Sequence, residues 1–236
     1  TEALRRSERE MAWREMARQI AHEIRNPLTP MKLSIQHLQK SWKNKSEKFP
    51  SRFENTTQTL IEQIDTLSSI ATEFSNFAKM PTPNIESFNV ISRLENVILL
   101  FENTEHDIEL YFENNNMERL DVMADKEQIQ RVFINLIKNG IQSVPENTHG
   151  IINIAVKANH QNALIQISDN GAGIPEDKRE KLFRPSFTTK SGGMGMGLAI
   201  VKNIVEATNG KIWFDTAINQ GTTFYVQLPL DKEGEQ

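Results

Sequence analysis

Two neighbouring residues near the N-terminus have the chemistry of a nucleophile and its base. His22 and Glu23 lie in the segment Ala-His-Glu-Ile-Arg-Asn-Pro-Leu, where apolar residues recur at helical spacing. At about 100° per residue, His22 is rotated by roughly 200° from Ile24 on the apolar face, so its imidazole is expected to face solvent. A neutral imidazole keeps one nitrogen lone pair for attack, and Glu23 could hold or deprotonate the other nitrogen. The alternative is an inert surface pair, which is the commoner meaning of His-Glu on a helix.

Two asparagines farther along the chain could hold a metal ion. Asn135 and Asn139 lie four residues apart in the segment 126–143, whose apolar spacing predicts a helix, so both side chains share one face. Amide oxygens are suitable ligands for Mg²⁺, which commonly completes its octahedron with nucleotide phosphates and water. The alternative is a solvated polar face on an otherwise apolar helix.

A carboxylate ends a predicted strand and leads into a glycine-rich turn. From residue 168 the segment is Ser-Asp-Asn-Gly-Ala-Gly-Ile-Pro. Asp169 could accept a hydrogen bond from an exocyclic amine, and Gly171 and Gly173 would let a ligand approach the backbone closely. Asp-Asn-Gly is also a common turn sequence, so a plain turn is the alternative.

Three further glycines precede an apolar helix. Gly193, Gly195 and Gly197 alternate with methionine and run directly into Leu198. Backbone amides at a helix N-terminus lack internal partners and attract an anion, which predicts a phosphate site. A flexible linker is the alternative. The segment is neither a Walker loop, since no Gly-Lys-Ser/Thr follows, nor a dinucleotide-binding turn, since the strand-glycine-helix unit with its downstream acid is missing.

Two helices in the first 80 residues are expected to position His22. No glycine occurs there, and apolar residues repeat at four-three spacing in two runs that a polar segment, 43–51, separates. The runs are Ile24, Leu28, Met31, Ile35, Leu38 and Trp42, then Leu60, Ile64, Leu67, Ala71, Phe74 and Ala78. This pattern predicts a helical hairpin, with a kink at Pro27. Because two narrow seams bury too little alone, we expect a homodimer through residues 1–80 that closes a four-helix bundle.

A proline-rich stretch separates the hairpin from a different second half. Pro81 and Pro83 cannot continue a helix, so we expect a domain at 1–80 and a linker at 81–87. The second domain, 88–232, alternates predicted helices with extended runs. The helices are expected near 91–103, 126–143 and 197–208, and the strands near 108–113, 151–157, 163–168, 211–216 and 222–228. The expected fold class is therefore α + α/β, a helical-hairpin dimerisation domain followed by an α/β sandwich with a mostly antiparallel sheet.

The composition excludes several classes of protein. Of the 236 residues, 38% are hydrophobic and 25% charged, which is typical of a globular chain. A formal net charge of -4 offers no basic face, so no direct nucleic acid binding is expected. Without cysteine there is neither a disulfide framework nor a Cys-ligated metal site. No apolar run approaches the roughly 20 residues that span a bilayer, so the chain as given is expected to be cytoplasmic. Its abrupt start in a charged helical stretch suggests a longer protein.

These motifs, in this order, resemble those of the sensor histidine kinases of bacterial two-component systems. His-Glu-Ile-Arg-Asn-Pro-Leu is similar to the H box of that family, Asn-Leu-Ile-Lys-Asn at 135–139 to the N box, and the glycine segments to the first and second glycine boxes. The segment from Phe183 to Lys190 resembles the F box and a short lid, whose Thr-Thr-Lys is similar to nitrogen-regulation-type kinases. Gly140 stands where the family more often has alanine, and Met194 and Met196 replace frequent Thr and Leu.

The resemblance implies an ATP-binding domain of the gyrase, chaperone and histidine kinase type. It implies that His22 is phosphorylated from MgATP with Glu23 as the base, that the phosphoryl group passes to an aspartate of a response regulator receiver domain, and that Asn26 helps to dephosphorylate this partner. Asn139, helped by Asn135, would bind Mg²⁺, and Asp169 would recognise the adenine amine. The other implied nucleotide-binding residues are Lys138, Gly171, Gly173, Phe183, Phe187, Thr189, Lys190, Gly193, Gly195, Gly197, Leu198 and Thr222. By family habit, an absent upstream segment would anchor the full-length protein in the bacterial inner membrane.

Two other functions use the same motifs. A dimeric scaffold could bind ATP without phosphorylating itself, but the intact His22, Glu23 and Asn139 argue against it. An ATPase of the gyrase and chaperone type could hydrolyse ATP without a protein-bound intermediate, but such a protein would not be preceded by a phosphoacceptor hairpin.

Overall fold

The computed structural model describes residues 2–78, 83–101, 107–146, 148–159, 161–184 and 195–231. The chain divides into two compact units, of which one holds residues 1–80 and the other holds residues 81–184 and 197–236. Within the described residues, no helix combines the length and the apolar character needed to cross a lipid bilayer.

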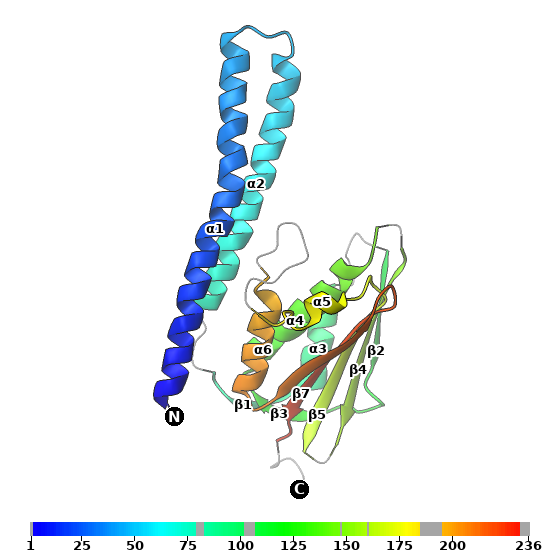
Figure 1. Ribbon diagram of the computed structural model, residues 1–236. Coiled ribbons are helices and arrows are strands. Elements are labelled where there is room, and N and C mark those ends of the chain that lie inside the picture. The colour runs from blue at the N-terminus through cyan, green and yellow to red at the C-terminus, as the bar shows by residue number, and fades with distance from the viewer. Residues whose placement is uncertain are drawn as a thin grey trace. The chain divides into compact units, whose positions relative to one another are not determined.

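The first unit is a helical hairpin (Figure 1), as the sequence predicts. Helix α1 spans Glu2–Lys43 and α2 spans Phe49–Ala78. The glycine-free run allows α1 to continue through Pro27 and Pro30, although each proline removes a backbone donor. The connection between the helices is short, with Lys45 in the left-handed region at a φ of 47°. Helix α2 begins inside the predicted polar segment, with Pro50 in its first turn. The first N–H groups of a helix have no partner within the helix, so a proline, which has no N–H, costs no hydrogen bond at this position.

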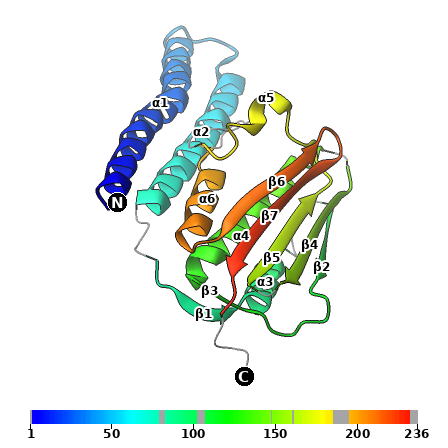
Figure 2. The same ribbon diagram turned by 60° about the horizontal axis from the view of Figure 1, so that its bottom comes forward.

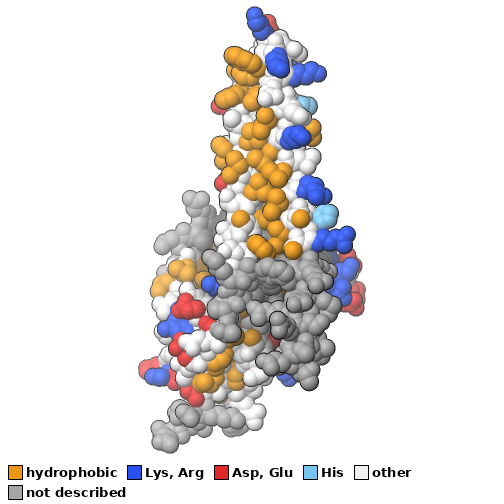
Figure 3. Space-filling view, turned by 90° about the vertical axis from the view of Figure 1, so that its left-hand side faces the viewer, with side chains coloured by type: hydrophobic (Ala, Val, Ile, Leu, Met, Phe, Trp, Pro, Cys, Tyr) orange, Lys and Arg blue, Asp and Glu red, His pale blue; other side chains and the backbone are white. Residues whose placement is uncertain are grey.

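Many apolar side chains of the hairpin are not covered within one chain. Helices α1 and α2 pack against each other, and Ile20 and Ile70 are buried. Several residues of the predicted seams are nevertheless exposed, and Figure 3 shows an apolar stripe along the hairpin. Where the structure describes the side chains of this unit, the large exposed apolar residues are Ile24, Leu28, Leu33, Ile35, Trp42, Phe53, Ile61 and Ile64. A continuous apolar stripe is unusual on a surface that faces water, and exposed apolar patches of this kind mark interaction sites.

The second unit is built on a five-stranded sheet. Its strands are β2 (Ile108–Glu113), β4 (Gly150–Ala158), β5 (Asn162–Asp169), β6 (Lys211–Ala217) and β7 (Gly221–Pro229). They lie in the order β2-β4-β5-β7-β6, and all pairings except the parallel β2-β4 pair are antiparallel. The predicted, mostly antiparallel sheet is therefore confirmed. Side chains alternate between buried and more exposed along β4, β5 and β7, so one face of the sheet belongs to the core.

Three helices cover that face (Figures 1 and 2). They are α3 (Val90–Leu99), α4 (Lys126–Ser143) and α6 (Gly197–Ala207). Helix α4 contacts α3, α6 and the central strands, which makes it the middle of the helical layer. Its side chains Val132, Phe133, Leu136 and Ile137 are completely buried. The helical layer over one sheet face gives the α/β sandwich that the sequence predicts.

Three short elements were not predicted. Strands β1 (Glu86–Asn89) and β3 (Asp121–Ala124) form a separate two-stranded antiparallel sheet, and α5 (Glu176–Arg179) is a single helical turn. Each has only four residues, too few for a periodic pattern to be visible. Helix α3 ends at Leu99, and the residues 102–106 beyond it lie outside the described part of the chain.

Candidate nucleotide site and phosphoacceptor histidine

His22 lies on α1 with its side chain exposed, as its rotation from the apolar face predicts. Glu23 is half-buried and Asn26 is exposed. Pro27 and Pro30 have no N–H to donate to the carbonyls four residues earlier, which belong to Glu23 and Asn26. The helix surface around His22 is therefore accessible and carries polar groups of both the backbone and the side chains.

Asp169 ends β5, and hydrogen bonds from three segments fix its carboxylate. Its Oδ1 accepts from Ser143 Oγ at 2.8 Å, from Gly171 N at 2.9 Å and from Thr222 N at 3.2 Å. These donors belong to the last residue of α4, to the glycine turn and to the start of β7. A carboxylate held in this way is a hydrogen-bond acceptor of defined direction, as recognition of an exocyclic amine requires.

The glycines after Asp169 are required by close backbone approaches. A Cβ on Gly171 would lie 2.0 Å from Ser143 Oγ and 2.6 Å from the Ser143 carbonyl oxygen. Gly173 has a φ of +71°, and a Cβ there would lie 2.2 Å from the carbonyl oxygen of Ala217. The turn is thus packed between the end of α4 and the end of β6, and both glycines are needed for the fold of the site itself.

The asparagine face of α4 meets the first turn of α6. Asn135 donates from Nδ2 to the Arg131 carbonyl at 2.9 Å, and a Cβ on Gly197 would lie 3.0 Å from Asn135 Oδ1. Asn139, one turn farther along α4, is half-buried, and Lys138 is exposed. Oxygen atoms on α4 and the backbone amides of the first turn of α6 therefore belong to one region, which fits Mg²⁺ and phosphate by donor chemistry.

The predicted residues of the F box and the second glycine box are only partly described. Phe183 packs edge-on against Phe214 of β6 with ring centroids 5.9 Å apart, so it anchors its segment to the sheet. Gly195 has a φ of +61°, and Leu198 is half-buried in the first turn of α6. The other residues predicted here, Phe187, Thr189, Lys190 and Gly193, lie outside the described residues.

Thr222 contributes to the site through its backbone as well as its side chain. Its N–H donates to Asp169, and its buried hydroxyl lies 3.0 Å from that of Thr216. Thr216 Oγ1 in turn accepts from Ile174 N at 2.9 Å, which ties the glycine turn to β6.

Sequence reasoning missed two contributors, Ser143 and Thr216, whereas Gly221 lies in the segment 219–224, which resembles the last glycine-containing turn of the family. Gly221 has a φ of +97°, and a Cβ there would lie 1.8 Å from the Asp169 carbonyl oxygen. Ser143 is the last residue of a helix whose bounds were predicted correctly. Its hydroxyl could have been found by asking which polar side chain at the end of this helix can reach Asp169. Thr216 has no signal in a single sequence, because its partner Ile174 is far away along the chain.

A charged cluster lies beside the glycine turn. His149 Nδ1 is 3.0 Å from Asp107 Oδ1, and His149 Nε2 is 3.3 Å from Glu109 Oε1. The hydrogen bond with Asp107 raises the pKa of His149 above its ordinary value, and the charges of both carboxylates add to this effect while burial opposes it. Asn170 joins the cluster to the turn, since its Nδ2 donates to the His149 carbonyl at 2.9 Å.

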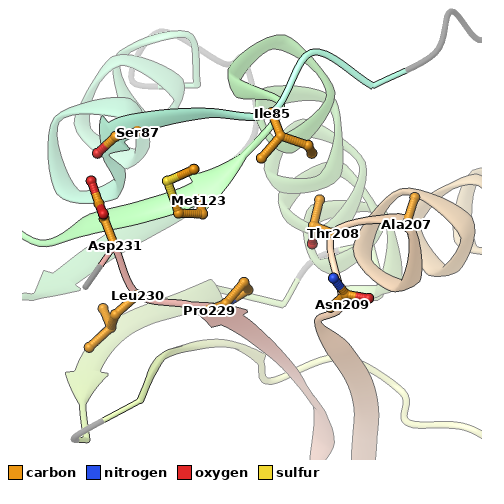
Figure 4. Close-up of a pocket in the computed structure, with 9 residues that line it drawn as sticks. All are labelled: Ile85, Ser87, Met123, Ala207, Thr208, Asn209, Pro229, Leu230 and Asp231. Carbon is orange, nitrogen blue, oxygen red and sulfur yellow. The ribbon is translucent and has the colours of Figure 1, made fainter. Parts of the chain in front are cut away.

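A groove of about 560 Å³ lies elsewhere in the second unit (Figure 4). It is lined by Ile85, Ser87, Met123, Ala207, Thr208, Asn209, Pro229, Leu230 and Asp231. None of these residues is among those predicted to bind a nucleotide, so the groove is separate from the candidate site. Across the described residues, no group of three or more His, Cys, Asp or Glu side chains is placed to hold a metal ion.

The exposed His22 on a helical hairpin, followed by an α/β sandwich whose Asp169 carboxylate is fixed as an acceptor, indicates the class of ATP-dependent histidine kinases. Residues 12–83 match the family model described as the His Kinase A (phospho-acceptor) domain. Residues 124–232 match the family described as histidine kinase-, DNA gyrase B- and HSP90-like ATPase. The chain belongs to the sensor histidine kinases.

Individual relatives agree with this assignment. Nitrogen regulation protein NtrY of Azorhizobium caulinodans is 33% identical over 233 residues, which cover 97% of this chain and 30% of that protein. The solved catalytic domain of histidine kinase ThkA is 35% identical, with a TM-score of 0.56 over 62% of this chain and 95% of that one. ThkA in complex with the response regulator TrrA is 29% identical, with a TM-score of 0.71 over 98% of this chain and 65% of that one. The chain spans about a third of the length of the curated relatives it matches.

Proposed function

We propose that this chain is a kinase core that phosphorylates His22 from MgATP and passes the phosphoryl group to an aspartate of a response regulator receiver domain. The observation that carries the proposal is the exposed imidazole of His22 beside Glu23, on the helix that matches the phosphoacceptor family. The ATPase family match of residues 124–232 supports ATP as the phosphoryl donor. The ThkA complex with TrrA supports a response regulator as the acceptor.

The chemistry is a pair of phosphoryl transfers. A ring nitrogen of His22 attacks the γ-phosphorus, the bond from that phosphorus to the bridging oxygen breaks, and ADP leaves. Glu23 accepts the proton from the opposite ring nitrogen, so that the phosphohistidine ring forms without a positive charge. In the second step an aspartate oxygen of the partner displaces His22 from phosphorus. Asn26, on the same helix face, is proposed to assist the separate reaction in which water hydrolyses the partner's aspartyl phosphate and inorganic phosphate leaves.

The nucleotide is proposed to bind to the second unit. Asp169 accepts a hydrogen bond from the adenine amine, Gly171 and Gly173 shape the pocket, and the amides of 193–197 receive the phosphates. Asn139 and Asn135 hold Mg²⁺, which supplies positive charge to the γ-phosphoryl oxygens when it is bound. The further proposed nucleotide contacts are Lys138, Phe183, Phe187, Thr189, Lys190, Leu198 and Thr222.

The hairpin is proposed to form a homodimer through residues 1–80. An apolar stripe runs along one exposed side of the two helices (Figure 3). The stripe of a second copy would cover it, and the two hairpins together would form a four-helix bundle. The proposed domains are 1–80 and 88–232 with a linker at 81–87. The longer protein, whose relatives exceed this chain in length, is proposed to be held at the inner membrane by an upstream segment, with this part in the cytoplasm.

Labelled ATP tests the proposal directly. The chain is incubated with γ-labelled ATP and magnesium, and the acid-labile label on the protein is measured. We expect the His22→Ala variant to lose the label by at least about 100-fold, because no other group replaces the nucleophile. His37→Ala, on an exposed histidine of the same helix, is the matched control and should keep the label. Equal labelling of His22→Ala and the unaltered chain would exclude His22 as the acceptor.

A further inference from the structure

We propose that Ser143 is a positioning residue that holds the Asp169 carboxylate and thereby sets the selectivity of the kinase for 6-amino over 6-oxo purine nucleotides. The inference rests on the proposed function, because it assumes that Asp169 faces the purine base. It concerns a residue whose side chain acts through Asp169.

The geometry joins the end of α4 to the end of β5. Ser143 Oγ lies 2.8 Å from Asp169 Oδ1 and 2.7 Å from the Gly140 carbonyl oxygen, so its single proton has two acceptors within reach. An ionised carboxylate is the stronger acceptor, because charge-assisted hydrogen bonds are roughly twice as strong as neutral ones. The hydroxyl proton is therefore directed to Asp169 while that group is ionised.

Ser143 supplies the side-chain donor among the three hydrogen bonds described on Oδ1. The other two come from the backbone amides of Gly171 and Thr222, which substitution of a side chain does not remove. The close fit extends to Gly140, where an added Cβ would lie 3.4 Å from Asp169 Cβ and 3.9 Å from Oδ2. The last turn of α4 thus bounds the carboxylate on one side by a hydroxyl and on another by a residue without a side chain.

A fixed carboxylate discriminates between purines by charge and by hydrogen-bond type. An ionised Asp169 only accepts hydrogen bonds, so it pairs with a 6-amino group and repels the oxygen of a 6-oxo group. A site built for one donor rejects an analogue that lacks it, because its own polar group is then left unpaired. Without the Ser143 hydroxyl, the carboxylate can rotate away from its fixed direction, which makes a 6-oxo base easier to accept.

The test measures selectivity on the whole chain with magnesium. Dissociation constants for the β,γ-imido analogues of ATP and GTP are determined by titration calorimetry for the unaltered chain, Ser143→Ala and Ser143→Thr. We expect Ser143→Ala to weaken the ATP analogue about tenfold, the usual effect of losing a hydrogen bond to a charged group. The ATP-to-GTP preference should fall by at least as much, and Ser143→Thr, which restores a hydroxyl, should recover part of it.

Ser168→Ala is the matched control. Its hydroxyl also makes a 2.8 Å hydrogen bond, to Thr223 Oγ1, and neither side chain is a donor in the three hydrogen bonds described on Asp169 Oδ1. This variant should keep both affinities within about twofold. At saturating ATP, the rate of His22 labelling should be nearly unchanged in Ser143→Ala, because the substitution acts on base binding and leaves the phosphoryl groups in place.

The possible failures are distinct. If the unaltered chain binds neither analogue, the proposed function is wrong. If it prefers the ATP analogue and Ser143→Ala keeps the same preference, Ser143 has only a structural role and this inference is wrong. If Ser143→Ala does not fold, Ser143→Thr and Ser143→Cys decide the question, since a weaker donor at this position must lower the preference in proportion.

Discussion

Asp169 receives hydrogen bonds from Ser143, Gly171 and Thr222, which are 26, 2 and 53 residues away along the chain. Only one of these partners is local, so the acceptor that would recognise adenine is assembled from three segments. The function of Asp169 therefore depends on hydrogen-bond donors that other elements place beside it. The same holds for Gly221, whose missing side chain leaves space for the backbone of Asp169.

At the residue scale, His149 makes the free energy of unfolding depend on pH. The pKa of His149 is raised in the folded state, mainly by its hydrogen bond with Asp107. In the unfolded chain its pKa is about 6.5. Between these two values the folded state binds more protons than the unfolded state, so the contribution is fully present below about pH 6.5 and is lost as the pH rises through the folded-state pKa.

We expect this effect to be visible as a difference between the unaltered chain and His149→Gln. The free energy of unfolding in urea, measured from pH 5 to pH 9, should fall more steeply with rising pH in the unaltered chain. His37→Gln, on the other unit, serves as the control and should keep the slope. Parallel curves for the unaltered chain and His149→Gln would show that the protonation of His149 beside Asp107 and Glu109 does not change the free energy of unfolding.

At the scale of elements, Asp125 fixes the start of the helix that carries the asparagines. Its Oδ1 accepts from Glu127 N at 3.1 Å and Gln128 N at 3.0 Å, so it is the N-cap of α4. Its Oδ2 accepts from Asn84 N at 2.9 Å, which ties the helix to the chain just before β1. The side chain is buried, so removing it leaves several donors without partners.

Asp125→Ala should therefore lower the free energy of unfolding by about 2 kcal/mol, more than a simple cap on an exposed helix. Equilibrium urea denaturation followed by circular dichroism measures this change. Asp177→Ala, at an exposed position in the first turn of α5, is the comparison and should stay within about 0.5 kcal/mol. A loss at Asp125 no larger than that at Asp177 would contradict the capping role.

At the scale of the whole molecule, the exposed stripe on the hairpin predicts self-association. Ile35 is 43% exposed on this stripe, and a charge there would be buried without a partner in the proposed four-helix bundle. Ile35→Asp should weaken the dimer by at least about 100-fold, which analytical ultracentrifugation over a concentration series can measure. His37→Asp, rotated by about 200° on the same helix, should leave the dimer intact. A monomeric unaltered chain at high micromolar concentration would rule out the proposed bundle.

Several elements could be predicted from the sequence because their signals are local. The helix Lys126–Ser143 and the strand Ile108–Glu113 have the bounds that their periodicity predicts, and Asp125 lies where a helix cap is favoured. The hairpin follows from a long glycine-free run with a repeated apolar seam. Candidate site residues such as Asp169 and Asn135 were found because each lies in a short motif whose residue types and spacing suit ligand binding.

The partners of those residues could not be predicted in the same way. β1 and β3 pair Glu86 with Ala124, and Ser143 meets Asp169, through contacts between segments that are distant along the chain. Local periodicity contains no information about such pairs, because they depend on how helices and strands pack together. The sequence by itself determined the longer helices and strands and the residue types available for phosphoryl transfer. Only the tertiary structure decided which donors hold the Asp169 carboxylate and which apolar residues remain exposed, since hydrogen bonds and burial depend on proximity in space.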